Sequence, residues 1–245
     1  MLRVYHLLLG LILLILTPVV IKFVHPNSST SKLPSTPVQQ PHSGTILTPK
    51  TSASNPTKEN IWKSILGKTT TPPGWKVAPC QGNAPLLCVS SPQELLGTVE
   101  MEVYPLTMEP NFQKMLVSAG IPPNAKVDLQ NPNYQTQVLI ALNTWIADYY
   151  AALSKELKGG YSVQPPQQIP FGMLHGMRYE LAIKKPDGGV EKQNIGYVAF
   201  DGRSLYVIHT AFDPAVKTGK FGKVENLSAF ESYLQAIVAD LRLPK

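Results

Sequence analysis

The chain has 245 residues, and charged side chains make up only 16% of them, below the roughly 25% typical of soluble domains. Two unusual segments lower this value, an apolar N-terminus over residues 1–24 and a Ser/Thr/Pro-rich stretch after it. Two cysteines are too few for a disulfide scaffold, a zinc ribbon or an iron–sulfur protein. The sequence has no second long apolar run, which argues against a multi-pass membrane protein.

The distribution of charge argues against nucleic-acid binding. The formal net charge is +6, but residues 72–245 hold 15 basic and 15 acidic side chains, so the excess lies in residues 1–71. A nucleic-acid-binding domain would carry its basic patch on the folded part. We therefore expect no nucleic-acid partner, and a positive segment near a bilayer needs only anionic lipid headgroups.

Residues 1–25 are predicted to be a transmembrane signal-anchor. From Val4 to Ile21 the sequence has 18 residues without Lys, Arg, Asp or Glu. A helix over residues 4–24, with Lys22 reaching the headgroups, would be about 31 Å long, close to the hydrocarbon core of a bilayer. Arg3 precedes the run, which favours the N-terminus inside and the C-terminal domain on the lumenal, periplasmic or extracellular side.

A cleaved signal peptide is the alternative for this segment. Its apolar region should be shorter, about 7–15 residues, and small residues in an A-x-A pattern should follow it. The run here is longer, and residues 22–26 (Lys-Phe-Val-His-Pro) offer no such cleavage site. The sequence therefore favours a single-pass anchor that is retained.

Residues 26–71 are predicted to be a linker that contains one short helix. Residues 26–60 hold 13 Ser or Thr and 6 Pro, a composition typical of disordered chain. A flexible coil of this length averages about 30–35 Å from end to end. Near residues 60–66, Ile61, Trp62, Ile65 and Leu66 share one helical face. This helix is expected to dock on the domain, with an interfacial membrane helix as the alternative.

The pattern of residues 72–245 predicts one α+β domain, an antiparallel sheet with helices packed on it. Alternating apolar residues predict strands, and helical spacing predicts a final helix with the stripe Phe230, Leu234, Ile237 and Leu241. Ser228 and Glu231 have the spacing of a capping box at the start of that helix. The expected strands are 74–77, 86–89, 99–104, 177–183, 195–200 and 205–212, and two further helices are expected over 110–119 and from 132 to about 158.

The same region resembles the PsbP-like family, named for an extrinsic subunit of photosystem II. The resemblance is carried by residues 184–189, 196–208 and Phe230, and also by Gly74-Trp75 and residues 103–105. It implies an αβα sandwich that serves as a binding or assembly module, in thylakoid or bacterial envelope settings. The same fold serves a Ran-binding nuclear import factor, so the fold does not fix the function.

Cys80 and Cys88 are the only thiols, and they leave two alternatives, a disulfide or two free thiols. Placement outside the cytoplasm favours the disulfide. The spacing is not the C-x-x-C of redox-active dithiols. The anchor and this cysteine pair are departures from the photosystem subunit, and they argue against a direct role in oxygen evolution.

No catalytic, cofactor-binding or metal-binding motif is visible in the sequence. His175 is a weak candidate metal ligand, because no carboxylate or second histidine lies two to four residues after it. His209 is expected to be a structural histidine on a packed face, and Glu100 and Glu102 to lie on a solvated strand face. Nucleophile signatures such as G-x-S-x-G are absent. We expect no cofactor and no enzymatic activity.

The sequence thus favours a membrane-tethered, non-enzymatic binding or accessory module that assists a membrane protein complex, such as a photosynthetic one. One alternative is a small-ligand or lipid carrier, with a pocket between sheet and helices lined by Trp145, Tyr149 and Tyr179. The other is an enzyme whose site is not visible as a motif. A closed apolar core would contradict the carrier alternative. A cleft lined by several polar groups with shifted pKa values would favour the enzyme alternative.

Overall fold

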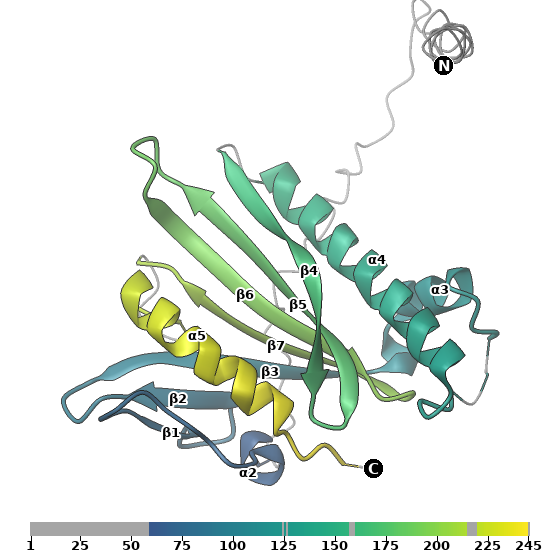
Figure 1. Cartoon of the computed structure of the whole chain (residues 1–245), viewed down its shortest axis with the longest axis horizontal. Coiled ribbons are helices and arrows are strands. Elements are labelled where there is room, and N and C mark those ends of the chain that lie inside the picture. The colour runs from purple at the N-terminus through teal and green to yellow at the C-terminus, as the bar shows by residue number, and fades with distance from the viewer. Residues whose placement is uncertain (1–58, 124, 126, 157–159, 215–219, 245) are drawn as a thin grey trace, which may run out of the picture. The chain divides into compact units, whose positions relative to one another are not determined.

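The described part of the computed structural model is built on a seven-stranded antiparallel sheet, with strand order β1-β2-β3-β7-β6-β5-β4 (Figure 1). The model describes residues 59–244, apart from 124, 126, 157–159 and 215–219, and all of these lie in the compact unit Thr45–Lys245. The strands are β1 (Lys76–Pro79), β2 (Leu86–Ser90), β3 (Leu95–Pro105), β4 (Tyr161–Phe171), β5 (Leu174–Lys184), β6 (Val190–Phe200) and β7 (Ser204–Phe212). The helices are α2 (Trp62–Ile65), α3 (Pro110–Ser118), α4 (Pro132–Glu156) and α5 (Val224–Ala239), with a 3₁₀ turn at Leu106–Met108. The predicted α+β class is confirmed.

Helices cover both faces of the sheet. Neighbouring residues of β7 belong to different core clusters: Leu205 and Val207 pack with α3 and α4, whereas Tyr206 and Ile208 pack with α5. Because successive side chains of a strand point to opposite faces, the two clusters lie on opposite sides of the sheet. Figure 1 shows α5 near β3 and β7, and α4 running beside β4 and β5.

Strand β4 was not predicted from the sequence. It carries Pro165, Pro166 and Pro170 among several glutamines, a composition that argues against a central strand. The structure places it at the edge of the sheet, where one side of the strand has no neighbour among the described strands, and its pairing with β5 is irregular between Gln164 and Gln167. The expected strands 177–183, 195–200 and 205–212 are therefore the last three of a four-strand meander, β4 to β7.

The predicted capping box of the final helix is wrong. Helix α5 begins one turn earlier, at Val224, and its N-cap residue Lys223 makes no side-chain capping bond. Ser228 is consequently an exposed position inside the helix, and Glu231 pairs with Arg178 of β5 instead of a backbone N–H. Three members of the predicted apolar stripe, Phe230, Leu234 and Ile237, are buried on α5 as expected. Leu241 is buried as well, but it lies beyond the helix, which ends at Ala239 and not after Leu241.

Helix α2 docks on the domain, and the interfacial alternative is wrong for this segment. Trp62 has no exposed surface and Ile65 is 1% exposed, so neither side chain can reach a lipid surface while the helix is docked. The predicted anchor over residues 4–24 and the linker up to residue 58 lie outside the described residues. Among the residues that are described, no helix combines the length and the apolar character needed to cross a bilayer.

Candidate functional site

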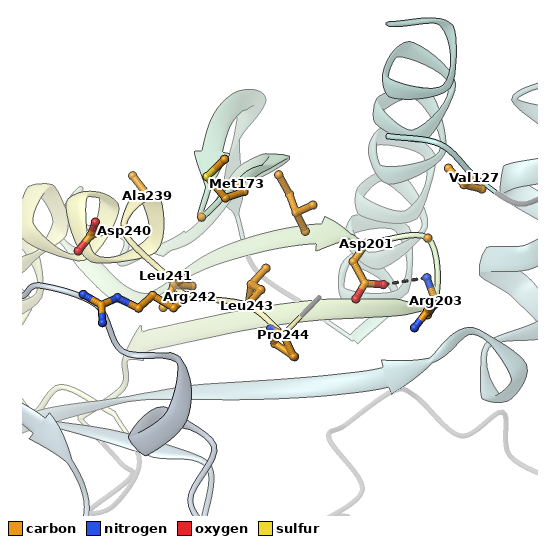
Figure 2. Close-up of a pocket in the computed structure, with 13 residues that line it drawn as sticks. Val127, Met173, Asp201, Arg203, Ala239, Asp240, Leu241, Arg242, Leu243 and Pro244 are labelled. Atoms are coloured by element: carbon orange, nitrogen blue, oxygen red, sulfur yellow. Dashed lines mark hydrogen bonds between the residues drawn. The ribbon is translucent and has the colours of Figure 1, made fainter. Parts of the chain in front are cut away.

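A pocket of about 650 Å³ lies where two strand turns meet the C-terminal segment (Figure 2). We call it the turn-end pocket. Its walls come from the β4–β5 turn, the β6–β7 turn, the end of α5 and the residues that follow α5. It is lined by Val127, Gly172, Met173, Leu174, Asp201, Gly202, Arg203, Ala239, Asp240, Leu241, Arg242, Leu243 and Pro244.

Two glycines with positive φ shape the turns of this pocket. Gly172 has φ 57° and donates its N–H to the carbonyl of Val238 at 2.8 Å. A Cβ at this position would lie 2.5 Å from the carbonyl oxygen of Leu241, so glycine allows the β4–β5 turn to lie against the end of α5. Gly202, with φ 94°, shapes the β6–β7 turn in the same way.

The two carboxylates of the pocket are already engaged by the protein. Asp201 accepts hydrogen bonds from the backbone N–H groups of Arg203 and Ser204, both at 2.7 Å, and from the Tyr206 hydroxyl at 2.8 Å. Asp240 accepts the backbone N–H of Lys68 at 2.5 Å. These hydrogen bonds fix the walls of the pocket, and both carboxylates keep their negative charge.

The two arginines of the pocket have no such partner. Neither Arg203 nor Arg242 forms an ion pair or a side-chain hydrogen bond within the described part of the chain, and both are exposed. Figure 2 places them at opposite ends of the pocket, with Leu241 and Leu243 between them. Each end of the pocket thus carries one unpartnered arginine and one hydrogen-bonded aspartate, and an anionic group of a ligand could contact the guanidinium at either end.

The two cysteines are paired. Cys80 and Cys88 form a disulfide across the β1–β2 turn, with Cα atoms 5.0 Å apart. The turn-end pocket contains neither of them. The bridge therefore acts on the β1–β2 hairpin rather than on this site.

His175 does not gain metal-binding partners from the fold. It is exposed on β5, and its Nδ1 lies 3.3 Å from Nε2 of Gln168. Within the described ranges, no three His, Cys, Asp or Glu side chains gather closely enough to hold a metal ion. The structure adds no support to His175 as a ligand.

Glu100 and Glu102 are less solvated than expected, because both are half-buried and paired. Glu100 Oε2 lies 3.2 Å from Nε2 of His209, and the hydrogen bond from His209 lowers the pKa of Glu100 although burial opposes it. The Tyr104 hydroxyl donates to Glu102, and burial together with that contact raises the pKa of Tyr104. His209 lies on the face that carries Leu205 and Val207, as expected, but it remains partly exposed. None of these groups lines the turn-end pocket, so the groups with shifted pKa values lie outside it.

The residues expected to line a carrier pocket pack against one another. The rings of Trp145 and Tyr149 stack with centroids 6.0 Å apart, and Tyr179 meets them edge-on at 6.0 Å and 5.3 Å. Burial raises the pKa of Tyr149 to about 12 and that of Tyr179 well above its usual value. These rings fill the space between α4 and the sheet, so they do not line the ligand pocket that the carrier alternative requires.

The packing of this aromatic cluster depends on Gly196, and a substitution there tests it. A Cβ at Gly196 would lie 2.1 Å from Cζ of Tyr179, so Gly196→Ala must displace that ring. We expect a loss of about 1–3 kcal/mol in unfolding free energy, the usual cost of overpacking. Gly160→Ala is the matched control, because a Cβ there meets no atom within 4 Å. Equal denaturation midpoints for the two variants would show that the cluster can repack freely.

Sequence reasoning did not identify the residues of the turn-end pocket. Nothing in the sequence links Arg203 to Arg242, which lies 39 positions beyond it in no motif. Only the fold brings the two arginines to the same pocket. The ion pairs of Arg178 with Glu180 and Glu231 were also missed, because the partners come from β5 and α5.

The fold and pocket together define an α+β sheet protein with a surface pocket that two arginines and two aspartates line, and comparisons with known proteins add little to that description. No protein-family model matches the chain, and no curated protein matches it in sequence. Among solved structures, it is similar to the solution structure of cyanobacterial PsbP (CyanoP) from Synechocystis sp. PCC 6803, with a TM-score of 0.37 and 8% identity. The alignment covers 72% of this chain and 85% of that chain. A similarity this low carries no argument about function.

Proposed function

We propose that the protein is a membrane-tethered, non-enzymatic binding module whose turn-end pocket holds an acidic segment of a membrane protein. The observation that carries the proposal is the pair of unpartnered guanidinium groups, Arg203 and Arg242, at the two ends of a pocket with Leu241 and Leu243 between them. Acidic side chains flanking an apolar one would complement this arrangement. The pocket's own carboxylates, Asp201 and Asp240, accept hydrogen bonds from backbone N–H groups and Tyr206, and among the described residues neither forms an ion pair with Arg203 or Arg242.

The predicted membrane anchor and linker explain how a pocket with low affinity could still bind a membrane protein. Exposed ion pairs contribute about 0–1 kcal/mol each, so two arginines alone give modest affinity. The anchor predicted over residues 4–24 would confine the domain to the membrane surface, where a short linker gives an effective concentration near the millimolar range. A neighbouring membrane protein would then be bound without a large interface.

The proposed compartment follows from the orientation of the anchor. Arg3 precedes the apolar run, which places the domain on the lumenal, periplasmic or extracellular side. The Cys80–Cys88 disulfide fits an oxidising compartment. The resemblance to the PsbP-like family adds the expectation that the partner belongs to a complex of a photosynthetic membrane.

One fractionation experiment tests both parts of this proposal. Native membranes are washed with carbonate, solubilised in mild detergent and separated on a native gel, and the full chain is located by an epitope tag. We expect the chain to stay with the membranes and to migrate with a larger complex. The variant Arg203→Glu/Arg242→Glu should also stay with the membranes but lose at least five-fold of its signal in the complex.

The charge-matched control is Lys184→Glu/Lys185→Glu, at the opposite end of β5 from the pocket. This control should behave as the parent chain does. Equal loss of the complex in both variants would show that net charge, not the pocket, matters. Release of the parent chain by carbonate would contradict the anchor, and recovery of a chain that starts near residue 26 would identify a cleaved signal peptide.

A further inference from the structure

The segment Asn60–Ile65, which we call the latch segment, is held by the β1–β2 hairpin. The side-chain amide of Asn60 donates to the carbonyls of Cys80 at 3.1 Å and Leu86 at 2.8 Å, and its oxygen accepts the Trp62 N–H at 3.1 Å. The Trp62 indole N–H donates to the carbonyl of Pro85 at 3.0 Å. Asn60 is 1% exposed and Trp62 is fully buried, so these bonds are shielded from water.

All three carbonyl acceptors belong to the stretch from Cys80 to Cys88 that the disulfide closes. Cys80 itself supplies one of them, and Pro85 and Leu86 lie between the two cysteines. β1 is a four-residue strand at the edge of the described sheet, and near Cys80 the disulfide acts together with one backbone bond, from the Cys80 N–H to the Leu86 carbonyl at 2.9 Å. Pro85 and Leu86 are also held by β3, through the Met101 N–H at 3.0 Å and the pairing of Leu86 with Glu100, so the disulfide acts mainly on the carbonyl of Cys80. The disulfide therefore restricts the part of the hairpin on which the Asn60 amide depends.

The other end of the latch segment is attached to the wall of the turn-end pocket. The carbonyl of Ile65 accepts the backbone N–H of Arg242 at 2.8 Å, and the N–H of Lys68 donates to the Asp240 carboxylate. Arg242 and Asp240 both line the pocket. The latch segment thus connects the disulfide hairpin to the pocket at the position where the chain from the N-terminus enters the domain.

We propose that the Cys80–Cys88 disulfide is a redox-sensitive lock on the latch segment. A dithiol reductant would attack one sulfur, form a mixed disulfide and then resolve it. Two electrons and two protons pass to the cysteines, and the reductant leaves as its own disulfide. Both cysteines are partly exposed, so a small dithiol can reach them.

Loss of the lock has a local consequence. When the hairpin opens at Cys80, the buried Asn60 amide loses an acceptor, which is unfavourable without water to replace it. Residues Asn60–Ile65 then leave the domain more often, which lengthens the tether and frees the Arg242 N–H. The main sheet keeps its ladders, because β3 pairs with β7 independently of the hairpin. The lengthening of a membrane tether rests on the proposed function, but the opening of the latch does not.

Hydrogen exchange followed by mass spectrometry tests the lock on the full chain in a non-ionic detergent, before and after treatment with dithiothreitol. Mass mapping first verifies that the disulfide is reduced. We expect amide exchange across residues 60–66 to become at least ten-fold faster, while residues 195–212 of the central sheet stay unchanged. Cys80→Ala/Cys88→Ala should show the fast exchange without reductant and should not respond to it.

Asn60→Ala serves as the second variant, since it removes the side-chain hydrogen bonds of Asn60 and leaves the disulfide intact. It should open residues 60–66 in both redox states. Unchanged exchange of residues 60–66 after full reduction would overturn the proposal. Equal acceleration of residues 60–66 and 195–212 would also overturn it, because the disulfide would then be a general stabiliser. Neither outcome depends on whether the chain is anchored in a membrane.

Discussion

Leu234→Ala is expected to lower the free energy of unfolding by about 2–5 kcal/mol, the range for truncating a buried leucine. Leu234 is fully buried in the middle of α5, and its neighbours on the same face, Phe230 and Ile237, are buried as well. This face covers the sheet near β3, β4 and β7. The cavity left by the alanine cannot be filled without moving the helix. The loss of unfolding free energy should therefore be larger than that caused by most single substitutions.

Urea denaturation of a fragment that begins at Thr45 measures this loss. Ser228→Ala is the matched control on the same helix, because Ser228 is exposed and lies inside α5 rather than at its cap. It should change stability by no more than about 0.5 kcal/mol, in the stabilising direction that helix propensity favours. A Leu234→Ala midpoint equal to the parent's, with the same slope, would mean that α5 is detachable and not part of the core.

Arg178→Met is expected to cost about 3–5 kcal/mol, since it leaves carboxylates in a partly desolvated site without their counter-charge. Arg178 is 7% exposed on β5, and its Nη2 lies 2.6 Å from Oε2 of Glu180 and also contacts Glu231 of α5. Burial acts to lower the pKa of Arg178, but the two glutamates outweigh it and the net direction is upward. The arginine therefore remains charged and links α5 to the sheet.

Two further variants separate charge from packing at this site. Arg178→Met/Glu180→Gln/Glu231→Gln removes the uncompensated carboxylates and should recover a large part of the lost stability. Lys63→Met breaks an exposed ion pair with Glu59 at 3.1 Å and should change stability by less than about 1 kcal/mol. If the triple variant is no more stable than Arg178→Met alone, the loss comes from packing and not from unpaired charge.

The sequence predicted those elements whose burial pattern is regular. The alternation of Val99 and Met101 in β3 and the stripe of α5 led to the observed elements, because one face of each is apolar. β4 was missed because an edge strand tolerates prolines and polar residues that a central strand excludes. The Ser228 capping box failed because its motif is short and the helix simply begins one turn earlier.

The candidate site could not be predicted from the sequence, for a different reason. Its arginines lie on a strand turn and beyond the last helix, and no local spacing relates them. The hydrogen bonds of Asn60 to the β1–β2 hairpin could not be predicted for the same reason, since the acceptors are backbone carbonyls 20 and 26 residues away. Local patterns specify elements, whereas these contacts depend on how the elements come together.

Site-specific photocrosslinking tests the central claim, that the turn-end pocket binds a membrane protein, most directly. A photoreactive phenylalanine analogue replaces Met173, which lines the pocket and is 97% exposed, or Met108, which is 73% exposed and does not line it. Irradiation of native membranes should give one crosslinked membrane protein from position 173. The product should be lost in Arg203→Glu/Arg242→Glu and absent from position 108. Equal crosslinking from both positions, or a position-173 product that persists in the arginine variant, would contradict the account.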